Sequence, residues 1–348
     1  MRNKFIEGHH TLIIPPDKIQ CFIDDDLGNI YHRKNLCLKI FKNPYRHHIE
    51  MKDVLWGMRD NKFRENLIEC TKIQNLLAFQ GLSPRVYDLI FLEFDKYKYA
   101  TQVTDYISSK TYCEIRQDVI HNQNKKILDY CKEVGIKPFD IGNGKNMRNG
   151  LFVDTQEFEF FDYKEGLKKR VITGLAYGGD TDRPYQSVEE LGIIGKRINS
   201  EREKLLQIPK GLPNDFTVLD FGCNGGYFMR KAFDAGASYG VGVDVSRVIE
   251  SAQELNNYLG YFNMEFMDTI PDIKFDLLLL LSSFSYIKPE EIFPKAKVAL
   301  IEGHCLNNEH TEDHYKKMLE PYYSKITTLG WNQDNPDQPP RVVMKGER

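Results

Sequence analysis

The sequence lacks any apolar run of the length that a membrane helix needs. That length is about 20 residues, and the N-terminal MRNKFIEGHH also has no apolar core of the kind found in signal peptides. Tryptophan is scarce, with 2 residues in 348, and the 7 cysteines are odd in number and show no paired metal-ligand spacing. We therefore expect reduced thiols, no structural metal, and a cytoplasmic protein without a transmembrane segment.

An excess of positive charge is also missing. The net charge is -3, and residues 1–170 carry 28 basic and 24 acidic side chains, whereas the remaining residues carry 19 and 26. A long nucleic acid needs a basic surface, so it is an improbable partner for the C-terminal half. The length predicts about two domains, each large enough to bury its own core.

The chain is organised around the stretch VLDFGCNGGYF at residues 218–228. An apolar run ends there in Asp220, and a helical pattern starts after the loop, which predicts a strand, a tight turn and a helix. A second predicted strand ends in Asp244, about 22 positions beyond Gly222, a spacing at which an acid reaches ribose hydroxyls. Such a unit binds a dinucleotide or another adenosine cofactor. The loop residues that allow close backbone approach are Gly222, Asn224 and Gly226.

The carboxylate of Asp220 helps to choose between these cofactors. At the entrance of the loop it would repel a pyrophosphate but attract the ammonium and sulfonium of S-adenosylmethionine, which favours a methyl donor over NAD. The loop resembles the first motif of the class I S-adenosylmethionine-dependent methyltransferases, and Asp244 matches their ribose-binding acid. FMDTI at residues 266–270 resembles their adenine-side motif through Met267 and Asp268.

Two later segments continue the resemblance, which covers residues 200–348. FDLLLLLSS at residues 275–283 looks like the fourth strand of that family, and KVALIEGH at residues 297–304 looks like the fifth. The resemblance implies an α/β domain with a doubly wound, mostly parallel, Rossmann-like sheet and with S-adenosylmethionine as cofactor. A doubly wound domain with an unrelated ligand is the alternative. The cofactor-binding residues that it implies are Asp220, Gly222, Asn224, Gly226, Asp244, Met267, Asp268 and Ser282.

Acceptor chemistry is expected at the carboxyl ends of the parallel strands, where ligands of open sheets bind. In this interpretation Ser282, Ser283, Glu302 and His304 stand at those ends. Glu302 and His304 are the candidate catalytic residues, with His304 as base for a hydroxyl acceptor; an anionic acceptor would need no base, and a buried, hydrogen-bonded histidine is the alternative. The Asp-Pro-Pro-Tyr signature of amino-group nucleic-acid methylases is absent, since the fourth strand reads LSSFSY.

The N-terminal part shows a different order of elements. Strands are predicted over residues 19–42, a helix over 62–80, and strands again over 86–94 and 98–107. This order resembles the small lobe of the protein-kinase and sugar-kinase superfamily, in which a strand lysine holds nucleotide phosphates and pairs with a helix glutamate. Lys39 matches the lysine, and Glu69 matches the glutamate, with Glu65 second.

The same resemblance extends to NGLFVDTQEFEFFDYKEG, starting at Asn149. Asn149 resembles the catalytic-loop asparagine and Asp162 the metal-binding aspartate, while Asp140 is the nearest candidate base. ATP with magnesium would be the corresponding ligand. The sequence departs from the pattern, however, because it has no glycine-rich phosphate loop, Asp140 is displaced, and almost no large lobe follows Asp162. Lys39 as a snorkelling edge-strand lysine and Asp162 as a solvated turn residue are the alternatives.

The expected domains are a smaller α+β kinase-like domain over residues 1–165, a linker and leader helix over 166–210, and a methyltransferase domain over 211–348. The leader of class I methyltransferases often folds over the cofactor, so it supplies candidate lid contacts, although a plain surface helix is as compatible with the sequence. His310 and His314 stand at helical spacing, which an exposed polar helix explains without a metal. The candidate lid residues are Tyr185, Arg197 and Arg202.

Three functions are compatible with this organisation. The first is a methyltransferase acting on a small-molecule, glycan or sugar-phosphate acceptor, with the kinase-like domain helping to bind it. The second is a bifunctional kinase and methyltransferase, similar to enzymes that cap bacterial surface glycans, although in those chains the methyltransferase usually comes first. The third is a non-catalytic binding scaffold, which the intact loop from Asp220 onward disfavours. The sequence gives neither the oligomeric state nor the pathway.

Overall fold

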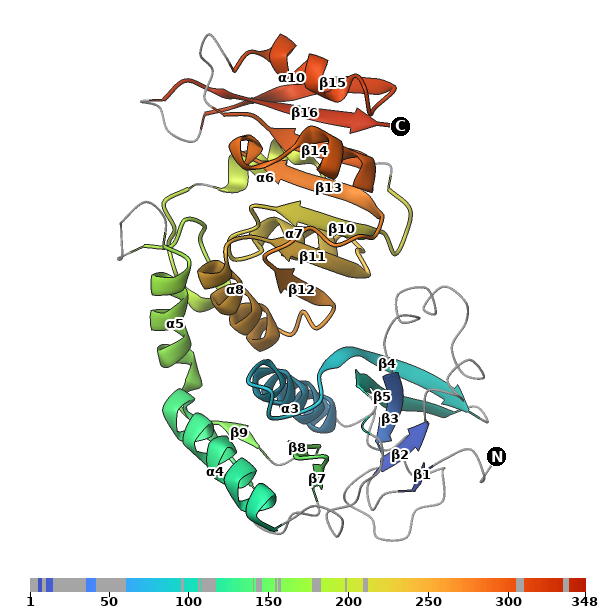
Figure 1. The fold of residues 1–348 in the computed structure, drawn as a ribbon, viewed down its shortest axis with the longest axis vertical. Helices are drawn as coiled ribbons and strands as arrows, with labels where there is room; N and C mark the ends of the chain where they lie inside the picture. Colours follow the sequence, from blue (N-terminus) through green and yellow to red (C-terminus); the bar gives the residue numbers. More distant parts are fainter. Residues whose placement is uncertain are drawn as a thin grey trace. The chain divides into compact units, whose positions relative to one another are not determined.

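The chain is described by a computed structural model, shown in Figure 1. It forms two compact units, Met1–Gly166 with Asn257–Phe262, and Leu167–Asn256 with Asn263–Arg348. The division passes within two helices, α5 (Tyr163–Gly174) and α8 (Ser246–Leu259). The structure describes residues 6–7, 11–14, 36–41, 61–94, 97–105, 107, 117–139, 141, 146–153, 155, 158–176, 183–197, 199–208, 212–304, 310–333 and 338–348.

The first unit is built on a five-stranded antiparallel sheet with strand order β1-β2-β3-β5-β4. Every neighbouring pair in it is antiparallel. Helix α3 (Asn61–Phe79) separates β3 from β4 in the chain, as the predicted order of elements requires. The strands are β1 (Ile6–Glu7), β2 (Thr11–Ile14), β3 (Leu36–Phe41), β4 (Val86–Phe94) and β5 (Tyr97–Asp105). The part of the predicted 19–42 strands before Leu36 lies outside the described residues.

Helix α3 packs through the apolar face that its sequence spacing predicts. Its buried apolar residues are Leu67, Cys70, Ile73, Leu76 and Leu77. The Asn75 side chain also fixes the helix to β4, because its Oδ1 accepts the Val86 N–H at 2.7 Å and its Nδ2 donates to the Val86 carbonyl at 2.9 Å. A buried amide that bonds both groups of one residue satisfies them without water. The apolar face and the amide together fix the helix against the sheet.

The rest of the first unit consists of helices and two short hairpin-like sheets. Helix α4 (Gln117–Val134) precedes β6 in the chain. Strands β6 (Ile136–Lys137) and β9 (Glu159–Phe160) pair antiparallel, as do β7 (Met147–Arg148) and β8 (Leu151–Phe152). Among the described helices, none is both long enough and apolar enough to cross a bilayer.

The second unit is built on a seven-stranded sheet with order β12-β11-β10-β13-β14-β16-β15, which can be followed in Figure 1. The first five strands in this order are parallel, and β16 runs antiparallel to both of its neighbours. This confirms the expected mostly parallel α/β sheet and its antiparallel last strand. The strands are β10 (Thr217–Phe221), β11 (Tyr239–Val243), β12 (Met264–Met267), β13 (Phe275–Leu281), β14 (Ala296–Glu302), β15 (Lys325–Asn332) and β16 (Arg341–Glu347).

Both faces of this sheet are covered, which explains the uninterrupted leucine run of β13. Leu278 and Leu280 belong to one core, and Leu277, Leu279 and Leu281 belong to the other. A strand buried on both faces loses the polar and apolar alternation of a half-exposed strand. The first core includes residues of α9 (Pro289–Ile292), η7 (Phe293–Lys295) and α10 (Glu312–Leu319), and the second includes residues of α6 (Asn199–Leu206) and α7 (Tyr227–Asp234).

Candidate functional site

The glycine-containing loop links β10 to α7 at the carboxyl ends of the parallel strands. Gly222 and Gly226 have φ values of 75° and 74°, and Asn224 has a φ of 47°, all in the left-handed region. Glycine adopts this region without steric cost, and asparagine is one of the few other residues that do so. The residue types predicted for the turn are therefore the ones its backbone requires.

The loop is also packed too closely for larger residues. A Cβ at Gly222 would lie 2.0 Å from the Ser283 hydroxyl oxygen, and a Cβ at Gly226 would lie 3.0 Å from the Phe266 ring. Phe266 on β12 also covers Gly242 of β11, where an added Cβ would lie 2.7 Å from the ring. The loop is thus packed against Phe266 of β12 and against Ser283, which follows β13.

Two carboxylates stand beside this loop. Asp244 follows β11, accepts the Asn224 N–H at 2.8 Å through Oδ2 and accepts the Val245 N–H at 2.8 Å through Oδ1. Asp220 on β10 is only 3% exposed, and no group in the described part of the chain donates a hydrogen bond to its carboxylate. Burial raises the pKa of Asp220 to about 7, with Arg202 opposing the rise and Asp244 adding to it. A cation beside Asp220 would restore its ionised form.

Glu302 at the end of β14 lies in a buried cluster of charged and polar side chains. It is 1% exposed, and its Oε2 accepts from Arg202 Nη2 at 2.9 Å and from the Ser282 hydroxyl. Its Oε1 lies 3.5 Å from Arg197 Nη2 and accepts from Asn332 Nδ2 at 2.6 Å. These partners hold the pKa of Glu302 at about 2 in spite of its burial. The structure therefore places Glu302 as a buried ion-pair anchor for the leader, with both oxygens engaged by protein groups.

Ser282, at the end of β13, is held in an uncommon backbone conformation. Its φ is 62°, its N–H donates to the Glu302 carbonyl at 2.8 Å, and its hydroxyl donates to the Glu302 carboxylate. A non-glycine residue in the left-handed region is strained, and such strain is often found at functional sites. Ser282 directly follows β13, which pairs with β10, the strand that carries Asp220.

His304 lies beyond β14 among several polar side chains. Its ring Nε2 is 3.0 Å from the Ser285 hydroxyl oxygen. Its backbone N–H donates to the Tyr315 hydroxyl oxygen at 2.8 Å. The His310 ring lies 5.1 Å from the His304 ring between centroids. Burial lowers the pKa of His304, and the neighbouring His310 and Arg341 lower it further against an opposing effect of Glu302. His304 is therefore held neutral, the form that can accept a proton.

His310 and His314, which follow β14, do not lie on one helix as their spacing predicted. Helix α10 begins at Glu312, so His310 precedes it, and Thr311 is the N-cap whose side chain accepts the His314 N–H. His310 instead lies near Tyr315, with Nδ1 3.2 Å from its hydroxyl oxygen. Within the described residues, no group of three metal-ligating side chains comes together. Of the remaining cofactor candidates, Met267 ends β12, and Asp268 lies 3.5 Å from the Ser246 hydroxyl.

The leader contributes two of its three candidate lid residues to the cluster around Glu302. Arg202 is 2% exposed and its guanidinium carbon lies 4.7 Å from the Phe228 ring centroid, next to the glycine loop. Tyr185 accepts a 2.6 Å hydrogen bond from Arg197 Nη1, and the Tyr185 N–H donates to the Leu175 carbonyl. The leader is thus packed onto the carboxyl edge of the sheet, which a plain surface helix would not require.

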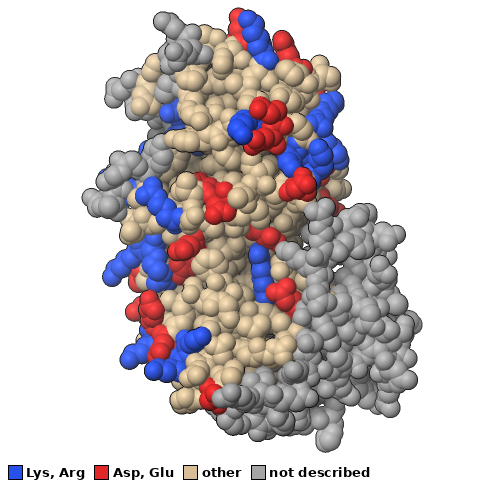
Figure 2. Space-filling view, in the orientation of Figure 1, with Lys and Arg blue, Asp and Glu red and all other residues tan. Residues whose placement is uncertain are grey.

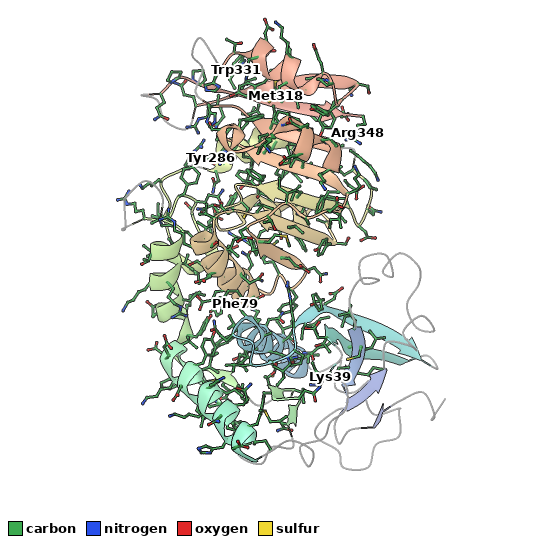
Figure 3. The ribbon with its side chains drawn as sticks, in the orientation of Figure 1. Lys39, Phe79, Tyr286, Met318, Trp331 and Arg348 are labelled. Carbon is green, nitrogen blue, oxygen red and sulfur yellow. The ribbon has the colours of Figure 1, made fainter. Side chains whose placement is uncertain are left out.

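Lys39 of the first unit, labelled in Figure 3, is unusual for a lysine because it is only 8% exposed. It lies on β3, the central strand of the sheet, and its ammonium donates to the Val153 carbonyl at 2.7 Å. Lysines are rarely buried, so a buried one on a central strand is a functional candidate. The structure thus differs from the alternative of a snorkelling edge-strand lysine.

The other kinase-like candidates occupy less suggestive positions. Glu69 accepts the Phe160 N–H at 3.2 Å, and Asp140 lies outside the described residues. Asn149 and Gly150 have φ values of 50° and 80° and form the two-residue turn between β7 and β8. An Asn-Gly pair is the preferred sequence for such a turn, so the local turn preference accounts for the position of Asn149. Asp162 is exposed just before α5 and donates its N–H to the Gly135 carbonyl.

Several residues around the site were not predicted from the sequence. Asn332, on the antiparallel β15, reaches Glu302 from a strand that carries no motif. Ser285 and Arg341 lie near His304 but come from segments far apart in the sequence. Arg230 and Asn256, described below, bond the carbonyl of Gly225. No local pattern marks these residues, because their role depends on the packing of distant elements.

No protein-family profile matches the sequence, and no curated protein matches it. Solved structures similar to the chain include methyltransferases at low identity. One is the bifunctional kinase-methyltransferase WbdD, with 18% identity, a TM-score of 0.42, and coverage of 51% of this chain and 46% of WbdD. The chain therefore spans about half the length of WbdD.

Two further solved structures are each similar to part of the chain. The magnesium protoporphyrin IX methyltransferase ChlM from Synechocystis PCC 6803, with bound SAM, shows 20% identity, a TM-score of 0.34, and coverage of 43% of this chain and 77% of ChlM. The N-terminal domain of EvdMO1, in the presence of SAH and D-fucose, shows 11% identity, a TM-score of 0.40, and coverage of 54% and 97%. At these TM-scores the similarities assign neither an activity nor a substrate.

Proposed function

We propose that the chain is an S-adenosylmethionine-dependent methyltransferase whose second unit binds the cofactor at the carboxyl ends of β10, β11 and β12. The observation that carries the proposal is the combination of strand order and loop chemistry. The order β12-β11-β10-β13-β14-β16-β15, with β16 reversed, is the arrangement that the class I resemblance implies. The glycine loop and the two carboxylates of Asp220 and Asp244 lie at the strand ends where that family binds its cofactor.

The residues present fit this cofactor better than a dinucleotide. Asp220 is buried without a hydrogen-bond donor among the described residues, beside a second carboxylate, so a pyrophosphate would meet two negative charges. The ammonium and sulfonium of S-adenosylmethionine would instead stabilise the ionised carboxylate. The Asn224 Oδ1 atom is buried and has no hydrogen-bond partner among the described residues, which also favours a polar ligand at the loop.

The reaction requires little more of the protein than position and charge. When bound, the cofactor supplies a methyl group on a sulfonium, and an in-line displacement depends chiefly on alignment. Asp244 would hold the ribose hydroxyls, Asp220 the ammonium, and Met267 with Asp268 the adenine side. Glu302 acts through Ser282 and Arg202 as a positioning residue, because its oxygens are engaged by protein groups.

The surroundings of His304 favour an anionic acceptor or a hydroxyl beside an anionic group. The cationic Arg341 acts on the His304 pKa, the His310 ring lies 5.1 Å from the His304 ring, and the Ser285 hydroxyl offers a further hydrogen bond. Tyr286, exposed and labelled in Figure 3, follows Ser285 in η6 (Phe284–Tyr286). A glycan or sugar-phosphate acceptor combines such an anion with a ring that can pack on an aromatic side chain. On the face shown in Figure 2, basic and acidic side chains are interspersed, which does not suit a long nucleic acid.

A second activity of the first unit has one specific observation in its favour. Lys39 is buried on the central strand β3, and α3 stands between β3 and β4 as in the kinase-like small lobe that the sequence resembles. A bifunctional enzyme would phosphorylate the acceptor before methylating it. We favour acceptor binding by this unit, because the sequence lacks the glycine-rich loop that supplies backbone donors to the phosphates.

Methyl transfer from labelled S-adenosylmethionine to a panel of glycans, sugar phosphates and small acids tests the proposal. Asp244→Asn should strongly reduce transfer to any acceptor found when S-adenosylmethionine is near its wild-type dissociation constant, whereas Lys39→Ala should leave transfer largely intact if the first unit only binds the acceptor. Labelled ATP with magnesium is added to the same panel. A labelled product that disappears in Lys39→Ala would establish the bifunctional enzyme, and the absence of any methylated product with a wild type that binds no cofactor would refute the methyltransferase.

A further inference from the structure

The carbonyl of Gly225, in the middle of the glycine loop, receives two side-chain hydrogen bonds. Arg230 Nη1 donates to it at 2.7 Å from α7, and Asn256 Nδ2 donates at 3.1 Å from α8. Arg230 Nη1 also donates to Asn256 Oδ1 at 3.1 Å, so the two side chains support each other. Gly225 stands between Asn224 and Gly226, whose positive φ values define the turn. The orientation of this peptide is therefore set by two buried side chains from different helices.

Arg230 is an unexpected residue for this place. It is 3% exposed, and a buried guanidinium costs several kcal/mol unless it is paired and hydrogen-bonded. Its charge is met by Glu190, whose Oε1 lies 3.3 Å from Arg230 Nε. Glu190 is 43% exposed and belongs to η5 (Glu189–Leu191) of the leader. One cation thus connects the leader to the backbone of the loop.

The leader has a second attachment to the same loop. Asn224 Nδ2 lies 3.4 Å from the Leu175 carbonyl, which also accepts the Tyr185 N–H. A Cβ added to Gly225 would lie 2.7 Å from the Leu175 Cδ1, so the loop and this segment are in close contact. The conformation of the loop consequently depends on the leader being in place.

We propose that Arg230 is a positioning residue for cofactor binding, and that Glu190 orients it so that the leader and the glycine loop are ordered together. This inference rests on the proposed function, because the loop is taken to bind S-adenosylmethionine. Arg230 itself does not touch the cofactor; it fixes the Gly225–Gly226 peptide of the same turn in which the Asn224 N–H bonds Asp244. Loss of the Glu190 charge leaves the guanidinium without its acidic partner and loosens its hold on the loop.

Calorimetric titration of the full chain with S-adenosylmethionine and with S-adenosylhomocysteine tests this. Glu190→Gln keeps the size of a half-exposed side chain, so the thermal unfolding midpoint should stay within about 2 °C. The dissociation constant of this variant for both ligands should rise about 3- to 10-fold, in keeping with the loss of an ion pair to a buried guanidinium. Arg230→Met should raise the constant further, and Arg230→Lys should recover part of the loss because one donor still reaches the carbonyl.

The matched control is Arg170→Gln, which breaks another ion pair of the second unit. Arg170 Nη2 lies 2.7 Å from Glu254 Oε1, in an ion pair between α5 and α8. Its dissociation constant should equal that of the wild type. Unchanged affinity in Glu190→Gln, or an equal loss in Arg170→Gln, would overturn the inference while leaving the proposed function standing. A wild type that binds neither ligand would overturn both.

Discussion

Replacement of Asp220 by asparagine should stabilise the protein without ligand and at the same time weaken the cofactor. The carboxyl has a reference pKa of 3.8 and a pKa of about 7 in the folded chain, because burial disfavours its charge. Between these values the folded state holds a proton that the unfolded state has released, so the stability falls as the pH rises from 3.8 to about 7. Above pH 7 the full cost is present.

The magnitude follows from the same shift. At pH 8 the ionised Asp220 costs about 4 kcal/mol of folding free energy, and at pH 5 the cost is about 1 to 2 kcal/mol. An asparagine does not titrate, so the difference in unfolding free energy between Asp220→Asn and wild type should grow by about 2 to 3 kcal/mol from pH 5 to pH 8. The contributions of other groups are shared by both proteins and cancel in this difference.

Denaturant unfolding followed by Trp331 fluorescence measures it. Trp331 lies on β15 of the second unit and is labelled in Figure 3. The remaining tryptophan, Trp56, is replaced by phenylalanine in both proteins so that the signal reports this unit alone. The variant should also lose at least about 10-fold in affinity for S-adenosylmethionine, since a charged acceptor is removed. If the unfolding free energies of the two proteins changed equally with pH, or if the variant bound S-adenosylmethionine as tightly as the wild type, the interpretation of Asp220 as a buried carboxylate that binds a cation of the cofactor would be wrong.

Three further outcomes follow from the site. His304→Gln should reduce turnover of a hydroxyl acceptor by about 10² to 10⁴ and remove the acid limb of the pH–rate profile, which should lie below the ordinary histidine range because the His304 pKa is lowered; an unchanged rate would indicate an acceptor that is already anionic. Glu302→Gln should destabilise the second unit by about 3 to 5 kcal/mol near pH 7, because Arg202 and Arg197 lose the buried carboxylate with which they pair. For the same reason the stability of the wild type should fall as the pH drops from about 4.5 toward 2. A smaller loss for Glu302→Gln in denaturant unfolding would contradict the anchor role. Lys39→Ala should abolish any binding of ATP, measured by equilibrium dialysis with magnesium, and retention of binding would remove Lys39 from a nucleotide site.

The second unit was largely predictable because its signals are local. Glycine at positions 222 and 226 indicates positive φ values, and the apolar run that ends in Leu281 indicates a strand covered on both faces. Each of these depends on a short stretch of chain and on general steric rules. The two strands predicted to end at Asp220 and Asp244 end at Phe221 and Val243, within one residue of the prediction.

The network behind the site was not predictable in the same way. Glu302 follows a strand as expected, but its pairing with Arg202 and Asn332 depends on how the leader and β15 pack. A residue at a strand end can face a ligand or the protein interior, and the sequence does not distinguish the two. Asn149 shows the opposite case, because the local turn preference of an Asn-Gly pair accounts for its position between β7 and β8.

The identity of the cofactor is the central claim, and calorimetry on the purified full chain tests it most directly. The wild type should bind S-adenosylmethionine with a dissociation constant on the order of micromolar and should not bind NAD. Asp244→Ala should weaken binding by about 1 to 3 kcal/mol, through lost hydrogen bonds between the ribose hydroxyls and a charged acceptor. Binding of NAD in the absence of any binding of S-adenosylmethionine would contradict the account.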